Sequence, residues 1–286
     1  MKTRILIAMS VVALAIAAVS CQKSDLITEK DLDMAEDNVI AEAIFDDIFN
    51  SVDIASWLLE GAMKSDFSKG MALSSDSCPV VTVNFPDGTT WPKVITIDYG
   101  DGCTINEVTR KGKIIIEITA RRHVTGSMRT VTFDGYYFND IAVEGTKSIK
   151  NLGPNSSENI VIEVKLEGGK MTLPDGKTIE REVNRQREWI AGLNTPFYIW
   201  DDECLITGTT SGKNINDVTY TTTISTPLLW KRVCRFIVSG VILIEREGFD
   251  PVELDYGDGE CDAKAVLRRG DEEKEILIRV RHKRML

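Results

Sequence analysis

The sequence contains very little histidine, with only His123 and His282 among 286 residues. It also lacks a His-Glu-x-x-His zinc motif, a Gly-x-Ser-x-Gly nucleophile turn and a glycine-rich phosphate loop. Each histidine ends a β-rich run next to arginine, which indicates a repeated structural position and not a metal pair. We therefore expect no cofactor, no metal and no enzymatic activity.

Net positive charge is absent as well. The chain has 44 acidic against 34 basic side chains, for a net charge of −10. An acidic body argues against nucleic acid or an anionic lipid surface as a partner. The basic stretches at Arg268-Arg269 and Arg279 to Arg284 are interleaved with strand residues. We interpret them as a solvated strand face, with a basic arm as the alternative.

Long apolar runs are missing apart from one at the start of the chain. Lys2 and Arg4 precede an apolar run from Ile5 to Val19, about 15 residues long. A membrane-spanning helix needs about 20 residues. A charged start, a short apolar core and small residues at its end are typical of a secretory signal peptide. We assign residues 1–20 to this signal.

The residues Ala18-Val19-Ser20-Cys21 resemble the lipobox of bacterial lipoproteins. The resemblance implies that Cys21 is lipidated, becomes the mature N-terminus and is the contact with the membrane. The following Gln22-Lys23-Ser24-Asp25 is similar to the start of Bacteroidota-type lipoproteins of unknown function. This resemblance implies a lipid-anchored protein of the cell envelope, in the outer membrane. An ordinary cleaved signal peptide is the alternative.

Residues 21–36 are polar and lack an apolar face, which predicts a tether. A helical segment is predicted over 37–70, with Asp37 or Asn38 as its N-cap and a break at 53–56. We expect this helix to pack on the sheet through one apolar stripe. The stripe comprises Ile40, Ala43, Ile44, Ile48, Val52, Ala55 and Leu59.

Residues 71–286 form a β-rich body in which the apolar pattern has a period of two. Pro174-Asp175-Gly176-Lys177 and Phe85-Pro86-Asp87-Gly88 are hairpin turn sequences. Helical segments do not separate the expected strands, so the fold class is mainly β with antiparallel sheets in two pseudo-repeats. The expected strands are 79–84, 93–98, 113–121, 129–133, 136–145, 160–166, 170–173, 179–189, 203–209, 217–223, 234–245, 251–256 and 274–282.

Two segments, 78–122 and 234–282, resemble each other. Each starts with cysteine and contains Asp-Tyr-Gly-Asp-Gly, with Cys103 directly after the first copy and Glu260-Cys261 after the second. Each then continues into a basic pair before glycine. Export favours disulfides, so we predict the pairs Cys78–Cys103 and Cys234–Cys261, with Cys204 left over. A fainter match relates the stretch from Ile141 to Thr146 to the stretch from Cys204 to Thr209. These matches predict two pseudo-repeats that share one sheet system.

The Asp-Tyr-Gly-Asp-Gly element has two interpretations. Glycine tolerates positive φ and aspartate caps tight turns, which favours a structural turn. The oxygen atoms of Asp98, Asp101, Asp255 and Asp258 could instead bind calcium. The element is also similar to the Asp-Phe-Gly-Asp-Gly turn of PKD-type immunoglobulin-like domains. That resemblance implies an extracytoplasmic β module.

Two further groups were weighed as candidate functional residues. Cys204 follows acidic residues that raise a thiol pKa, which disfavours a nucleophilic role. The aromatic residues of the middle region are expected in the core, with sugar stacking as the alternative. They are Tyr136, Tyr137, Phe138, Trp189, Phe197, Tyr198, Trp200, Tyr220 and Trp230.

The leading hypothesis is a non-enzymatic binding or structural module of the cell envelope, with a glycan or an envelope protein as its partner. The export signal, the β-repeat and the missing catalytic motifs favour it. A fimbrial or adhesin-type subunit is the second hypothesis. The third is a glycan-active hydrolase with paired carboxylates, which requires two carboxyl groups within about 10 Å.

Overall fold

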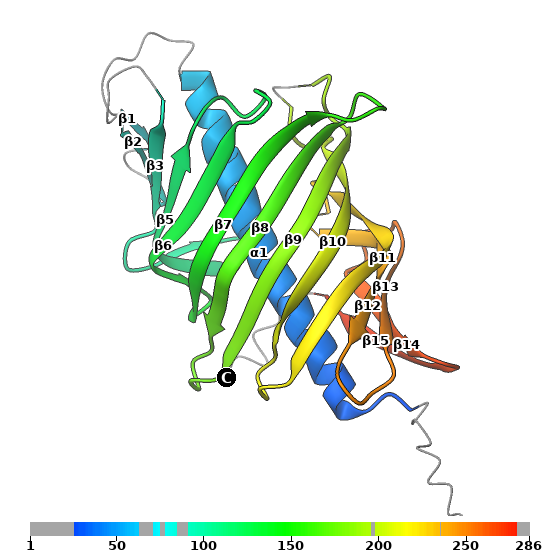
Figure 1. The fold of residues 1–286 in the computed structure, drawn as a ribbon. Helices are drawn as coiled ribbons and strands as arrows, with labels where there is room; N and C mark the ends of the chain where they lie inside the picture. Colours follow the sequence, from blue (N-terminus) through cyan, green and yellow to red (C-terminus); the bar gives the residue numbers. More distant parts are fainter. Residues whose placement is uncertain are drawn as a thin grey trace, which may run out of the picture.

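The computed structural model describes residues 26–62, 71–74, 78–84, 91–195, 198–234 and 236–278. They form one helix, α1, and one 15-stranded antiparallel sheet that curves around it (Figure 1). The mainly β fold class with an N-terminal helix is confirmed. The elements are α1 (Glu29–Ala62), β1 (Met71–Ser74), β2 (Val80–Asn84), β3 (Lys93–Asp98), β4 (Cys103–Ile105), β5 (Val108–Ile118), β6 (Met128–Phe138), β7 (Ile141–Pro154), β8 (Ile160–Thr172), β9 (Thr178–Ala191), β10 (Glu203–Lys213), β11 (Thr219–Lys231), β12 (Phe236–Glu245), β13 (Val252–Asp258), β14 (Lys264–Arg269) and β15 (Glu272–Leu277).

The strands follow one another through the sheet almost in chain order, and only β4 lies off this path, paired with β5. The turn at 174–177 connects β8 to β9, as predicted, with Thr172 opposite Thr178. The turn at 85–88 lies outside the described residues. Consecutive hairpins require no crossover helix, which explains how one helix suffices for so many strands.

Helix α1 begins at Glu29 and not near Asp37, so the predicted tether is too long. Thr28 and Asp31 form a capping box: the Thr28 amide donates to Asp31 Oδ2 at 2.8 Å, and the Asp31 amide donates to Thr28 Oγ1 at 3.4 Å. The predicted break at 53–56 is also wrong. Ser56 Oγ donates to the carbonyl oxygen of Val52 at 2.7 Å, one turn back, and the helix continues to Ala62.

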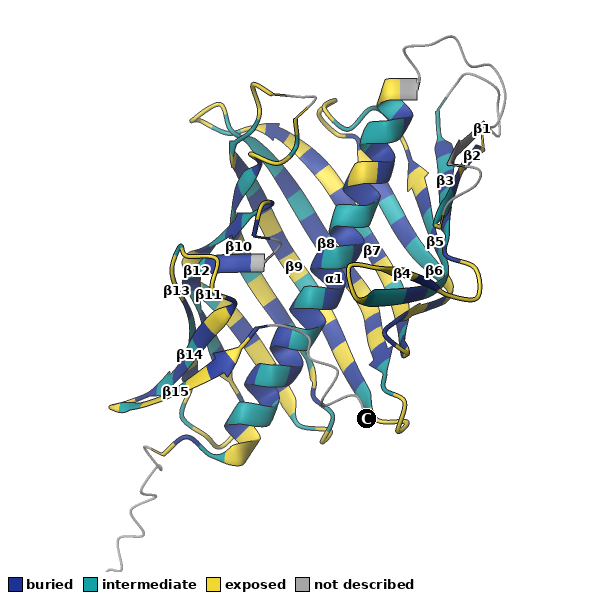
Figure 2. Cartoon of the chain, turned by 180° about the vertical axis from the view of Figure 1, so that it is seen from behind, coloured by how far each residue is buried: buried dark blue, intermediate teal, exposed yellow. Residues whose placement is uncertain are grey.

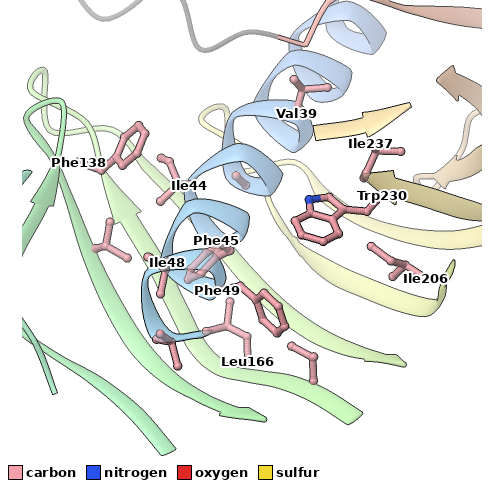
Figure 3. Close-up of a cluster of buried hydrophobic side chains, with 14 of the residues drawn as sticks. Val39, Ile44, Phe45, Ile48, Phe49, Phe138, Leu166, Ile206, Trp230 and Ile237 are labelled. Carbon is pink, nitrogen blue, oxygen red and sulfur yellow. The ribbon is translucent and has the colours of Figure 1, made fainter. Parts of the chain in front are cut away.

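The core lies between α1 and the concave face of the sheet. In Figure 2 the helix crosses the sheet, with both sheet ends turned toward it. Figure 3 shows Ile44, Ile48 and Phe49 of α1 among side chains of the strands. Phe49 packs against Trp189 at 6.4 Å between ring centroids. The predicted apolar stripe is thus a packing face.

Bulges at glycine bend the long strands. Gly145 in β7 and Gly208 in β10 have φ of 120° and 122°, each beside a shift in strand register. We expected strands to end at Gly145 and near Gly208, whereas β7 and β10 continue past them, because a bulge absorbs the irregular residue without ending the pairing. The same mechanism joins the two strands predicted at 160–166 and 170–173 into β8.

The two similar segments lie at opposite ends of the sheet. The strands that follow the basic pair and glycine are paired differently: Ile114–Ile118 of β5 pair with β3, whereas β15 pairs with β14 and not with β13. The two-repeat organisation is therefore not confirmed, although both segments belong to a single sheet. Strand β14 was missing from the prediction. Among the described residues, α1 is not apolar enough to cross a membrane.

Candidate binding groove

Ion pairs fix α1 inside the curved sheet. Glu42 accepts hydrogen bonds from Arg181 and from Arg185, whose Nη1 lies 2.8 Å from Glu42 Oε2. Burial by itself would raise the pKa of Glu42, but the positive charges of Arg181 and Arg185 outweigh it and lower the pKa to about 2. The carboxylate is therefore charged at neutral pH.

The same arrangement recurs along the helix. Near its start, Asp31 lies 2.6 Å from Arg246 and 2.8 Å from Arg269. Near its end, Asp53 lies 3.3 Å from Arg129 and 2.5 Å from Arg232. A buried ion pair adds little net stability, but removing one partner is costly, so these pairs hold the helix in one position. Asp46 with Arg187, and Asp47 with Arg110, complete the set.

The opposite side of α1 faces a groove with a volume of about 1030 Å³. The floor runs along the helix between Val39 and Leu58, about 28 Å at 1.5 Å per residue. One wall comes from β2, β3, β4 and the start of β5, and the other from β12, β13 and Ile278. The groove therefore lies between the two ends of the sheet, where α1 is seen in Figure 2.

Equivalent positions of the two similar segments line the opposite walls. Val81 and Ile237 each follow the first cysteine of their segment by three residues, and both line the groove. Tyr99 and Tyr256, the tyrosines of the Asp-Tyr-Gly-Asp-Gly elements, line it as well. The sequence match that predicted the disulfides thus also marks the walls, which could not be recognised without the sheet topology.

Both predicted disulfides are present and lie at the walls. Cys78 pairs with Cys103 and Cys234 pairs with Cys261, with Cα–Cα distances of 5.7 and 5.4 Å. These distances fall in the usual range for disulfides. Each bond ties the start of a wall strand to the residue after the turn. The walls are therefore covalently braced at both ends of the sheet.

The groove combines apolar walls with polar atoms on its floor. Arg110 pairs with Asp47 at 2.5 and 2.9 Å. Asn50 Oδ1 and Tyr256 Oη line the groove region and have no hydrogen-bond partner among the described residues. A buried polar atom without a partner costs about 1–3 kcal/mol, so a ligand that donates a hydrogen bond to Asn50 Oδ1 or pairs with the Tyr256 hydroxyl would remove this cost.

Of the four aspartates predicted as turn or calcium residues, two accept a hydrogen bond from the amide of the glycine two residues ahead. Asp98 Oδ1 accepts a hydrogen bond from the Gly100 amide, and Asp255 Oδ1 accepts one from the Gly257 amide, both at 2.8 Å. Asp98 also pairs with Lys113, and Asp255 with Arg268. Asp101 and Asp258 are exposed. Across the described ranges, no three His, Cys, Asp or Glu side chains are grouped as a metal site would require.

Cys204 is free and fully buried, and its thiol lacks the lowered pKa of a nucleophile. Burial raises the pKa of its thiol, and the negative charges of Asp202 and Asp53 act in the same direction. A thiol with a raised pKa is protonated at neutral pH and reacts slowly. His123 is exposed, whereas Cys21 and His282 lie outside the described residues.

The aromatic side chains divide between the core and the surface. Phe197 lies outside the described residues, and Tyr137 and Tyr198 are exposed. Trp200 is 48% exposed and lines the groove near Arg232. Sequence reasoning missed Trp200 as a groove residue because its loop has no periodic pattern. The buried members are Tyr136, Phe138, Trp189, Tyr220 and Trp230.

No family model, no curated protein and no solved structure matches this chain.

Proposed function

We propose that this chain is a lipid-anchored protein of the bacterial cell envelope, in the outer membrane, whose body is a non-enzymatic binding module. The lipobox-like residues before Cys21 support the anchor. Helix α1 starts at Glu29, so only a short segment separates the anchored residue from the body. The groove is thereby held close to the membrane surface, where other envelope proteins are found.

The ligand that fits the groove is an extended peptide segment of an envelope protein with apolar and positively charged side chains. Val81 and Ile237 supply apolar surface on opposite walls. The exposed carboxylate of Glu107 lies in the same groove. The unpartnered carbonyl oxygen of Asn50 carries the proposal, because it accepts hydrogen bonds and lies on the floor between apolar walls.

The carboxylates of the groove favour binding over hydrolysis. A general acid of a glycoside hydrolase requires a raised pKa. The pKa of Glu42 is instead lowered to about 2 by Arg181 and Arg185, after burial is overcome. Asp46 and Asp47 are each paired with an arginine as well. Each of these groups is thus already committed to a structural ion pair.

A peptide titration tests the ligand class. We expect residues 22–286 to bind an eight-residue peptide of alternating Lys and Val, observed as a change in tryptophan fluorescence. A peptide of alternating Glu and Val should bind at least tenfold more weakly because its carboxylates are repelled by the exposed Glu107. A peptide of alternating Lys and Ser should also bind about tenfold more weakly than the Lys-Val peptide because it lacks apolar side chains. Equal binding of all three peptides would contradict the proposal.

The anchor is tested separately. The full chain expressed in a bacterium should appear in the outer-membrane fraction, with acyl chains on the peptide that starts at Cys21. The Cys21→Ala variant should lose both the lipid mass and the membrane fraction. A wild-type chain released without lipid would show an ordinary secreted protein.

A further inference from the structure

The described chain ends inside the wall of the groove. Ile278 is only 6% exposed, lines the groove beside Tyr256, and donates its amide hydrogen to the carbonyl oxygen of Ala263 at 3.0 Å. The chain thus leaves strand β15 at the wall of the groove. Residues 279–286 follow directly and lie outside the described part of the chain.

The sequence that follows has the chemistry expected of the ligand. Residues 279–286 read Arg-Val-Arg-His-Lys-Arg-Met-Leu, with four permanent positive charges, three apolar side chains and no acid. This composition contrasts with the chain as a whole, whose net charge is −10. The side chains of Ile276 and Ile278 are buried, and Val280 continues their alternation.

One charged group of the groove lining complements this segment. Glu42, Asp46 and Asp47 are already paired with arginines, whereas the carboxylate of Glu107 is exposed. Glu107 is therefore the carboxylate of the lining that attracts a cationic segment.

The length of the segment also suits the groove. Eight residues in extended conformation span about 26 Å. The floor between Val39 and Leu58 is about 28 Å long. A segment that starts at Ile278 can therefore follow much of α1 without a further linker.

We propose that residues 279–286 occupy the groove along α1 and compete with the partner segment for the same surface. The competition rests on the proposed function, whereas the occupancy itself does not. A short covalent connection gives the segment an effective concentration in the millimolar range. A partner must therefore displace it, which makes binding dependent on how strongly the partner outcompetes the chain's own residues.

The test compares residues 22–278 with residues 22–286 and uses a fluorescent peptide with the sequence of residues 279–286. We expect this peptide to bind the shorter chain at least tenfold more tightly than the longer chain. In the shorter chain, Ile54→Arg should weaken binding at least tenfold because Ile54 lies on the floor. Leu152→Arg is the matched control: Leu152 is 40% exposed and Ile54 38%, but Leu152 is on β7 away from the groove.

A second variant covers the case in which the shorter chain does not fold. The full-length double variant Arg281→Glu with Arg284→Glu keeps the length of the segment but removes its attraction to the groove. It should bind the added peptide as the shorter chain does, at least tenfold more tightly than wild type. Equal affinity of the peptide for wild type and double variant, or no effect of Ile54→Arg, would overturn the proposal.

The alternating Lys-Val peptide separates the two proposals. If the shorter chain binds that peptide but not the peptide of residues 279–286, the groove is a binding site and the internal occupant is wrong. If it binds only the peptide of residues 279–286, the proposed occupancy by these residues is supported and the proposed class of partner is wrong. Dimers of the shorter chain that the peptide does not dissociate would show a second copy in the groove and also contradict the occupant.

Discussion

Arg232 donates a hydrogen bond from Nη2 to Oδ2 of Asp53 across 2.5 Å, and both side chains are only 3% exposed. Arg232 lies after β11, next to the disulfide-bonded Cys234. Asp53 also pairs with Arg129 of β6, so one helical carboxylate connects strands from both halves of the sheet. The floor and a wall of the groove are positioned by this contact.

Replacement of Asp53 should destabilise the protein strongly. Asp53→Asn removes the counter-charge of the buried Arg129 and leaves Arg232 with Asp202 alone, and breaking a buried pair costs about 3–5 kcal/mol. Urea unfolding of residues 22–286 measures the change. Glu29→Gln is the control, since Glu29 is exposed on the same helix and should change the free energy of unfolding by less than about 0.5 kcal/mol. Equal effects of both substitutions would show that the Asp53 pairs do not fix the helix.

Acid should weaken the helix-sheet contact through Glu42. The pKa of Glu42 is about 2 in the folded protein, and its ordinary value is 4.5. Its contribution to the free energy of unfolding is therefore present above pH 4.5 and is lost as the pH falls toward 2. We expect a loss of a few kcal/mol over this window. The free energy of unfolding, measured with urea at several pH values between 2 and 6, should rise less steeply with pH for Glu42→Gln than for wild type. Identical slopes would contradict the assignment to Glu42.

Lys147 should make stability depend on pH in a higher range, and with the same sign as Glu42. Burial, and then the charge of Arg187, lower its pKa from 10.5 to about 7, although its Nζ donates to the carbonyl oxygen of Phe45 at 2.9 Å. The unfolded chain thus binds more protons between pH 7 and 10.5, and stability should rise with pH in that window, by at most about 1.4 kcal/mol per pH unit. Lys147→Met should remove this rise between pH 7 and 9. A variant that keeps the wild-type slope would exclude Lys147 as its source.

The glycine bulge of β10 should not tolerate a side chain. A Cβ on Gly208 would lie 2.3 Å from the carbonyl oxygen of Asn184, and φ is +122°. Gly208→Ala should therefore cost about 2 kcal/mol or more. Gly61→Ala is the matched control, because no atom lies within 4 Å of the added Cβ and alanine favours helix, with an expected gain of about 0.5–1 kcal/mol. Thermal unfolding distinguishes the two, and a stable Gly208→Ala would contradict the bulge.

Local features of this fold could be predicted from the sequence, and long-range ones could not. The disulfides followed from the match between two cysteine-bounded segments, and the turn at 174–177 from its residues. The early start of α1 was missed although Thr28 and Asp31 carry the signal of a capping box. The polar stretch before the apolar stripe was interpreted as a tether because polar residues normally indicate a segment that is exposed to solvent.

The ion pairs of α1 explain why that rule failed. Glu42 and Asp53 are polar yet face the sheet, because arginines on distant strands compensate their charges. The arginines of β9 are flanked by polar residues, as Arg181 is by Glu180 and Glu182, so no local pattern marks them as buried. The groove was missed for the same reason: its walls come from residues more than 150 positions apart, such as Val81 and Ile237.

The central claim is that the groove between the two disulfide-braced ends of the sheet is a binding site. The most direct measurement is photo-cross-linking of the alternating Lys-Val peptide, carrying a benzophenone group, to residues 22–286, followed by mass mapping. We expect cross-links to groove residues such as Ile54 and Trp200, suppressed by an excess of unlabelled peptide. Cross-links confined to the outer face of the sheet, for example at Leu152, would contradict it.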